Sequence, residues 1–212
     1  MGKRSDFERV ERDFYPTPLA AIQPLVPHLP KGEFTFADTS FGTGDLAHGV
    51  ELLTEGRGTC TFKSDIEDRH PDSWQKDMFD VTRGHLDGVT MGIFNTPWDR
   101  GIFHRAIEHF RQILPCWFLI DADWMHTIQS EEIILGCRKI VSVGRVKWMP
   151  GSKHTGKDNC QWMLFDRGEY DFIQFVGRKK FPKIDIESLK PAPSAPEADE
   201  TIDIEEYIAK KA

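Results

Sequence analysis

The chain has 212 residues and a mass of 24.4 kDa, a length that predicts one catalytic domain with a full hydrophobic core. Hydrophobic residues make up 39% of it and charged residues 29%, proportions that exclude a largely disordered chain. No apolar segment follows the N-terminus, and no run reaches the roughly 18 apolar residues of a membrane span, so we expect a cytoplasmic protein without membrane contact.

The net charge of −7 at pH 7 is unevenly distributed along the chain. From Asp185 onward, eight acidic residues stand against three lysines, which places −5 on this segment and leaves −2 on residues 1–184. The segment includes the Pro/Ala/acid stretch "KPAPSAPEADE", which cannot pack a core. We therefore predict a catalytic domain over 1–184 and an acidic, unpacked tail over 185–212 that could dock on a protein partner.

Within the predicted domain, basic residues gather at 138–157 and again at 177–183. Nucleic-acid binding needs a positive face, because the phosphate backbone supplies much of the affinity. A local basic face is therefore compatible with the sequence, although the protein as a whole is not basic.

The first predicted elements alternate between strand and helix. Residues 34–38, "FTFAD", form a strand that ends in an acid, and 45–56 have the apolar spacing of a helix that stops at Gly56. Residues 60–66, "CTFKSDI", form a second strand, which again has an acid at its end.

The same alternation continues into the middle of the chain. The apolar run 91–94 is a strand, and Asp99 can cap a helix over 100–114 that ends at Pro115. The strand after it, in "CWFLIDADW", is continuously apolar, as in parallel strands buried on both faces. The apolar stripe of the helix is predicted at Ile102, Ala106, Ile107, Phe110 and Leu114.

The pattern changes over residues 139–166, where two strand-like runs surround a loop rich in Gly, Lys and Asn. This arrangement predicts an antiparallel pair at the edge of the sheet. Together with the preceding β-α-β pattern, it indicates an α/β fold, a doubly wound and mostly parallel sheet with an antiparallel C-terminal edge hairpin.

In a doubly wound sheet, ligands bind beyond the carboxyl ends of the strands. After the first strand, Gly42 and Gly44 allow a tight turn and a close approach of the backbone to a ligand. Asp65, at the end of the second strand, is placed to accept hydrogen bonds from both hydroxyls of a ribose. Asp77 could accept from an adenine amino group. These residues alone leave two interpretations open, a nucleoside site or a structural turn.

The tetrapeptide Asn95-Thr96-Pro97-Trp98 follows the strand at 91–94. A carboxamide oxygen and the backbone carbonyl beside it can accept two hydrogen bonds from one amino group, while proline shapes the turn and adds no donor. Two such acceptors favour a pyramidal nitrogen whose lone pair can attack a methyl sulfonium. Trp98 offers an aromatic face to a base swung out of a duplex. The tetrapeptide thus predicts an amine-methylating site.

Other chemistries have less support. The four cysteines are Cys60, Cys116, Cys137 and Cys160, and none forms a C-x-x-C pair, so neither disulfides nor a zinc site is indicated. Cys116 could serve as the nucleophile of cytosine C5 methylation, but it opens an apolar strand and is interpreted as a core residue. The spacing of His104 and His109 does not fit a metal site, so we expect no metal.

The order "FYPTP", "DTSFGTG", "SDIE", "KDMF", "NTPW" resembles the S-adenosylmethionine-dependent, amino-methylating DNA methyltransferases of the N6-adenine type, especially their short phage and prophage form. The resemblance covers about residues 12–175. It implies a Rossmann-like class I methyltransferase fold, S-adenosylmethionine as cofactor, DNA as substrate with RNA as a further possibility, and the cytoplasm of a bacterial or phage-infected cell.

The resemblance also implies roles for individual residues. Catalysis would involve Asn95, Thr96, Pro97 and Trp98, with the asparagine favouring adenine N6 over cytosine N4. The cofactor would be bound by Phe14, Tyr15, Thr17, Asp38, Phe41, Gly42, Gly44, Asp65 and Asp77. The substrate would contact Arg145, Trp148, Lys153, Lys157 and Asn159.

The chain departs from this family pattern at two places. Thr96 stands where the family has proline, and the cofactor loop begins D-T-S-F instead of with an acid-Pro pair. These departures leave open a catalytically degenerate fold that acts as a binding module. Methylation of RNA adenine and methylation of a protein glutamine amide also stay open, because both would use the same amine pocket.

Overall fold

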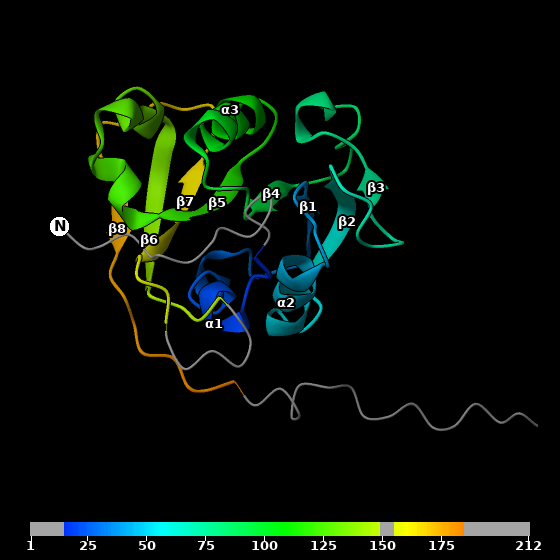
Figure 1. The fold of residues 1–212 in the computed structure, drawn as a ribbon, viewed down its shortest axis with the longest axis horizontal. Helices are drawn as coiled ribbons and strands as arrows, with labels where there is room; N and C mark the ends of the chain where they lie inside the picture. Colours follow the sequence, from blue (N-terminus) through cyan, green and yellow to red (C-terminus); the bar gives the residue numbers. More distant parts are fainter. Residues whose placement is uncertain (1–14, 149–154, 185–212) are drawn as a thin grey trace, which may run out of the picture. The chain divides into compact units, whose positions relative to one another are not determined.

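The computed structural model describes residues 15–148 and 155–184 (Figure 1). Its contacts divide the chain into a unit of Met1–Pro182, which holds every helix and strand described here, and a second unit of Lys183–Ala212. The strands are β1 Phe34–Asp38, β2 Gly58–Asp65, β3 Trp74–Gln75, β4 Met91–Phe94, β5 Cys116–Asp121, β6 Cys137–Gly144, β7 Cys160–Phe165 and β8 Gln174–Val176. The α-helices are α1 Leu19–Ile22, α2 Asp45–Leu53 and α3 Arg100–Arg111. The described 3-10 helices are η2 Val26–His28, η3 Met78–Asp80, η4 Ala122–His126, η5 Ile128–Ser130 and η6 Ile133–Gly136.

The described strands form one eight-stranded sheet in the order β3-β2-β1-β4-β5-β7-β6-β8. The pairs β2–β3, β1–β2, β1–β4 and β4–β5 are parallel, so these five strands end at one edge of the sheet. Only β7 runs against its neighbours, β5 and β6. The predicted α/β, doubly wound, mostly parallel sheet is confirmed, and β6 and β7 form the predicted antiparallel pair.

The hairpin sits in the sheet in a way that the sequence pattern did not specify. Its second strand, β7, is inserted between β5 and β6, and the short strand β8 forms the outer edge beside β6. Every residue of β7 is buried, whereas two of the three residues of β8 are exposed. A strand that is buried along its whole length needs a neighbouring strand on each edge to satisfy its backbone N–H and C=O groups, which explains why β7 lies inside the sheet.

Alternation along the strands gives each face of the sheet its own core. Trp117 and Leu119 of β5 pack with α1 and α2, and Cys116, Phe118 and Ile120 pack with α3. Figure 1 shows α1 and α2 on one face of the sheet and α3 on the other. Successive side chains of a strand point to opposite faces, so one apolar run supplies both layers.

The helix α3 begins as the sequence predicts. The Asp99 carboxylate accepts a hydrogen bond from the Gly101 N–H at 2.9 Å, which satisfies a backbone donor in the first turn. The buried stripe of α3 is Phe103, Ala106, Ile107 and Phe110. The predicted stripe was therefore wrong at Ile102, which is half-buried and lines a cavity. In the described ranges, no helix has the length and apolarity to cross a membrane.

Candidate active site

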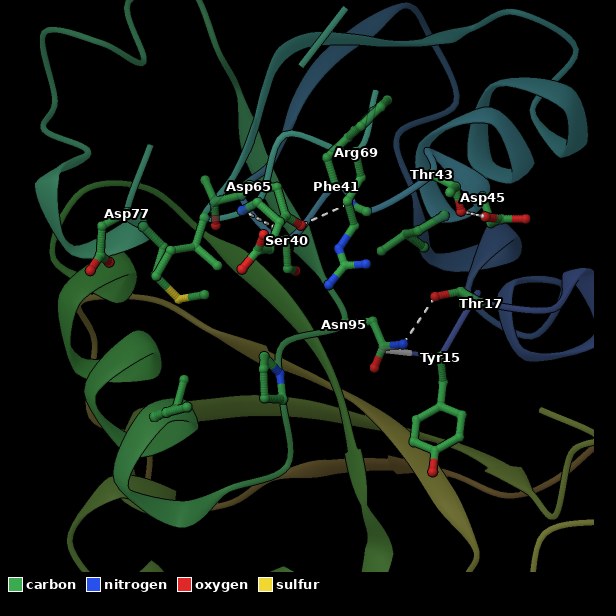
Figure 2. Close-up of a pocket in the computed structure, with 18 of the residues that line it drawn as sticks. Tyr15, Thr17, Ser40, Phe41, Thr43, Asp45, Asp65, Arg69, Asp77 and Asn95 are labelled. Carbon is green, nitrogen blue, oxygen red and sulfur yellow. Dashed lines mark hydrogen bonds between the residues drawn. The ribbon is translucent and has the colours of Figure 1, made fainter. Parts of the chain in front are cut away.

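A cavity of about 850 Å³ lies beyond the carboxyl ends of β1, β2 and β4 (Figure 2). Its walls are the turn after β1, the loop after β2, η3, the turn after β4, the start of α3 and residues 15–17. This is the edge at which doubly wound sheets bind ligands. The volume is in the range of small-molecule sites.

The turn after β1 is shaped by its two glycines. Gly42 and Gly44 have φ of 55° and 85°, a conformation that other residues rarely adopt. The Gly44 N–H donates to the Phe41 carbonyl at 2.7 Å, which closes the turn before α2. A Cβ on Gly44 would lie 2.7 Å from His48 Cε1 and 2.8 Å from Phe41 Cζ. Phe41 and Gly42 line the cavity, whereas Gly44 supports the turn from outside it.

Asp65 joins this turn to the end of β2. Its Oδ2 accepts from the Gly42 N–H at 2.8 Å, and its Oδ1 accepts from the Glu67 N–H at 2.9 Å. Each carboxylate oxygen can accept more than one hydrogen bond, so Asp65 can hold the loop and still receive hydroxyl donors. Its side chain lines the cavity.

Asp77 lies at the far end of the cavity from the glycine turn (Figure 2). Its Oδ1 accepts from the Phe79 N–H at 2.9 Å and so caps η3. The guanidinium carbon of Arg105 lies 4.0 Å from the centre of the Phe79 ring, and both residues line the cavity. This end therefore combines an acid with an aromatic ring that carries a guanidinium over it, and the Asp77 carboxylate can accept from the amino group of a flat heterocycle.

Two buried polar groups near the turn lack a protein partner. Asp38 is fully buried and does not line the cavity; its Oδ1 accepts from the Ser40 N–H at 3.1 Å, but its Oδ2 has no hydrogen-bond partner among the described residues. Burial raises the pKa of Asp38 from 3.8 to about 7, against the lowering effect of the Ser40 backbone hydrogen bond. Thr39, which lines the cavity, has a buried Oγ1 that is also unpartnered within the described ranges. Buried polar groups are usually paired, so a polar ligand fits here.

Asn95 projects into the same cavity from the end of β4 (Figure 2). Its Nδ2 donates to Thr17 Oγ1 at 3.0 Å, a contact between residues 78 positions apart. No described residue donates to its Oδ1, which therefore remains an acceptor facing the cavity. Pro97 also lines the cavity, while Thr96 between them is buried and does not. Tyr15 and Thr17 lie beside the amide, on the N-terminal segment.

Trp98 is placed beside the cavity and does not line it, although its neighbours Pro97 and Asp99 do. Its indole N–H donates to the Leu119 carbonyl at 3.0 Å. Its ring meets that of Trp148 edge-on, with centroids 5.5 Å apart and planes at 89°. The structure thus brings two predicted site residues together as an aromatic pair, packed against the core.

The other predicted substrate residues lie on the loop between β6 and β7. Arg145, Lys157 and Asn159 are exposed and do not line the cavity. The Gly156 N–H donates to the Val146 carbonyl at 2.8 Å, which ties the two arms of the loop together beside Trp148. Phe14 and Lys153 lie outside the described residues, as does the predicted tail over 185–212.

Sequence reasoning missed several residues that the structure places in the cavity, among them Thr39, Arg69 and Phe79. Thr39 and Arg69 closely follow the ends of the predicted strands 34–38 and 60–66, so the sheet-edge rule is the signal that could have found them. Phe79 follows β3, a two-residue strand that the sequence did not predict. It also missed the contact between Thr17 and Asn95, for which the sequence carries no local signal.

The cysteines take no part in the cavity. All four are free and buried, as predicted. Burial raises the pKa of the Cys116 thiol well above its ordinary value, which opposes formation of a nucleophilic thiolate. Within the described part of the chain, no group of three or more His, Cys, Asp or Glu side chains could hold a metal ion.

No known family profile and no curated protein matches the sequence. Among solved structures, a modification subunit assigned to a type I restriction enzyme of Vibrio vulnificus matches 76% of this chain and 46% of its own length, with 13% identity and a TM-score of 0.53. The Mtq2-Trm112 complex of E. cuniculi, which methylates the eRF1 termination factor, matches 76% of this chain and 98% of its own, with 12% identity and a TM-score of 0.47. A protein of Pyrococcus horikoshii assigned as an RNA methyltransferase matches 76% of this chain and 90% of its own length, with 16% identity and a TM-score of 0.48. The chain therefore has the Rossmann-like class I methyltransferase fold.

Proposed function

We propose that the protein transfers a methyl group from S-adenosylmethionine to the exocyclic amino group of adenine in DNA. The observation that carries this proposal is the position of Asn95. Its carboxamide projects from the end of β4 into the cavity that the glycine turn and Asp65 also line. A donor site and an amine acceptor site therefore share one space.

The cavity walls suit the parts of this cofactor in order. Asp77 and the Phe79 surface at one end would hold the adenine, and Asp65 would accept from the ribose hydroxyls. Gly42 would let the backbone approach closely, and the buried Thr39 hydroxyl would gain a polar partner. Tyr15 and Thr17 would border the methionine end beside Asn95. When bound there, S-adenosylmethionine supplies a methyl group activated by a positively charged sulfur.

Asn95 would prepare the target nitrogen. Its Oδ1 and the main-chain carbonyl of Thr96 would accept the two hydrogens of the amine, which favours a pyramidal nitrogen with its lone pair directed at the methyl carbon. The bound cofactor would supply the methyl carbon for this lone pair and keep the electron pair of the carbon–sulfur bond on sulfur, and the methylated nitrogen would lose its proton to water. Thr17 would fix the orientation of the amide throughout, because it bonds to Nδ2 at 3.0 Å.

The aromatic pair of Trp98 and Trp148 would replace the stacking that a flipped base loses. The pair adjoins the cavity at Pro97, where the target base would enter. The exposed residues Arg145 and Lys157 on the same loop as Trp148 would face the phosphate backbone. We further propose that the enzyme acts in the cytoplasm of a bacterial or phage-infected cell.

The direct test is to incubate the protein with methyl-labelled cofactor and plasmid DNA, and then to digest the DNA to nucleosides. Label in N6-methyldeoxyadenosine supports the proposal, and label in a methylated deoxycytidine corrects the target base. Parallel reactions with RNA and with a glutamine-containing peptide cover the other acceptors.

One observation favours the glutamine amide as a second candidate target. Trp98 is fixed by its hydrogen bond to the Leu119 carbonyl and by its contact with Trp148, an arrangement that also suits a target that needs no stacking.

The non-enzymatic alternative is tested separately. Isothermal titration of the protein with S-adenosylmethionine should release or absorb heat with saturation. Absence of binding at high protein concentration would contradict methyl transfer to any of these acceptors and would favour a binding module. Thr96, which replaces the family proline, is the residue that motivates this alternative.

A further inference from the structure

Arg69 reaches into the cavity from the loop after β2, although no sequence motif assigns it a role. The loop is folded by two hydrogen bonds: Asp65 Oδ1 accepts from the Glu67 N–H at 2.9 Å, and the Glu67 carbonyl accepts from the Arg69 N–H at 3.0 Å. These contacts tie the backbone of Arg69 to the end of β2. The side chain of Arg69 therefore extends into the cavity from backbone that is anchored at the strand end proposed to hold the ribose.

Figure 2 shows the order of the labelled side chains along the cavity. Asp77 lies at one end, Asp65 and Ser40 lie near the middle, and Tyr15, Thr17 and Asn95 lie at the other end. The Arg69 guanidinium points between Ser40 and Asn95. With adenine at Asp77 and ribose at Asp65, this is the region left for the amino-acid end of the cofactor.

The charges of the cofactor decide which of its groups an arginine can bind there. The sulfur and the amino group of S-adenosylmethionine are positive, and its carboxylate is its one negative group. A guanidinium repels the first two and can form a two-pronged hydrogen bond with the third. Of the charged groups of this cofactor, the carboxylate is therefore the one that a guanidinium in this part of the cavity would bind.

We infer that Arg69 binds the carboxylate of the methionine moiety and thereby selects cofactors that carry this group. The inference rests on the proposed function, because it takes S-adenosylmethionine as the ligand of the cavity. It adds a specificity residue that neither the motifs nor the fold assigns. The acids Asp65 and Glu67 on the same loop limit the effect, since they also attract the guanidinium.

The test compares two ligands that differ only in the carboxylate, S-adenosylmethionine and its decarboxylated form. Isothermal titration of the full chain gives both dissociation constants for wild type, Arg69→Met, Arg69→Lys and Arg105→Met. Arg105→Met is the matched control, because Arg105 also lines the cavity but lies over Phe79, at the adenine end. Circular dichroism confirms that each variant is folded.

Wild type should bind S-adenosylmethionine at least about tenfold more tightly than the decarboxylated form, the size expected for a charge-assisted hydrogen bond. Arg69→Met should remove this preference by weakening the first ligand alone, Arg69→Lys should keep part of it, and Arg105→Met should keep all of it. A preference unchanged in Arg69→Met, or an equal loss for both ligands, overturns the inference.

The outcomes separate this inference from the proposed function. If wild type binds S-adenosylmethionine and Arg69→Met removes the preference, but wild type methylates no nucleic acid or peptide, the proposed reaction is wrong and the role of Arg69 stands. If wild type binds neither ligand, both are overturned. If methyl transfer occurs and the preference is absent, only the role of Arg69 falls.

Discussion

The glycine turn after β1 and the Asn95 amide after β4 line one cavity, but they are held in different ways. The turn is closed by neighbours in sequence, such as the hydrogen bond from the Gly44 N–H to the Phe41 carbonyl. The amide is oriented by Thr17, which is 78 positions away. The glycine turn is therefore closed by its own main chain, with one added contact from the Asp65 side chain, whereas the orientation of the Asn95 amide depends on a side chain that only the complete fold brings near.

This difference suggests how the two halves should respond to mutation. Damage to the turn should change cofactor affinity and stability together, because the turn also begins α2. Damage to the amide should change the reaction and leave stability and cofactor binding nearly unaltered. The following variants test that separation.

The largest effect is expected from Asn95→Ala. The variant removes an acceptor that matters mainly when the nitrogen becomes pyramidal, so kcat for methyl transfer should fall by about 100-fold or more. Cofactor affinity, measured by titration, should change by less than about threefold. Equal activity of variant and wild type would refute the role of Asn95.

Asp65→Ala should act on the part of the cavity formed by the glycine turn, where the cofactor is proposed to bind. It removes the predicted ribose acceptor and the partner of the Gly42 N–H, so cofactor affinity should fall by about 10- to 100-fold. Asp65→Asn is the matched control, because it keeps an oxygen for Gly42 and should lose less. If titration shows unchanged binding in Asp65→Ala, the ribose does not lie at the end of β2.

Gly44→Ala should destabilise the protein by about 2 kcal/mol, because φ is positive and the added Cβ would clash with His48 and Phe41. Gly56→Ala is the control: Gly56 has φ of 76°, but nothing lies within 4 Å of its Cβ position. It should cost about 1 kcal/mol through backbone strain alone. Thermal unfolding measures both, and equal losses would show that the turn tolerates the side chain.

Asp38→Asn should stabilise the protein at high pH. Because burial raises the Asp38 pKa from 3.8 to about 7, the folded state keeps a proton that the unfolded chain loses, and stability falls as pH rises between these values. Asparagine stays neutral and can still accept from the Ser40 N–H. The variant should therefore melt a few degrees higher than wild type at pH 8, with the gap closing toward pH 4. A gap that does not vary with pH contradicts the raised pKa.

The smallest effect is expected from Thr17→Val, which removes the hydroxyl that orients Asn95. The amide could then rotate, so kcat should fall by about three- to tenfold, the value of one neutral hydrogen bond. Thr17→Ser keeps the hydroxyl and should retain most of the activity. If both variants lower activity equally, the methyl group of Thr17 matters more than its hydrogen bond.

Local sequence was sufficient for the elements and for the turn. The strand 34–38 has the predicted bounds, and Asp99 caps α3 as expected, because alternation and capping act over a few residues. The conformation of Gly42 and Gly44 follows from the residues themselves, since glycine alone adopts positive φ at little cost. The roles of all the predicted site residues stay predictions, and two of these residues, Phe14 and Lys153, lie outside the described residues.

The sequence by itself determined that β1, β2 and β4 would present polar residues at one edge of a parallel sheet. Only the tertiary structure decided that β7 lies between β5 and β6, that Trp98 pairs with Trp148, and that Thr17 and Arg69 point into the cavity. The physical reason is range: periodicity and turn chemistry act between neighbours, whereas these contacts join residues distant in the chain, whose meeting depends on how the whole core packs.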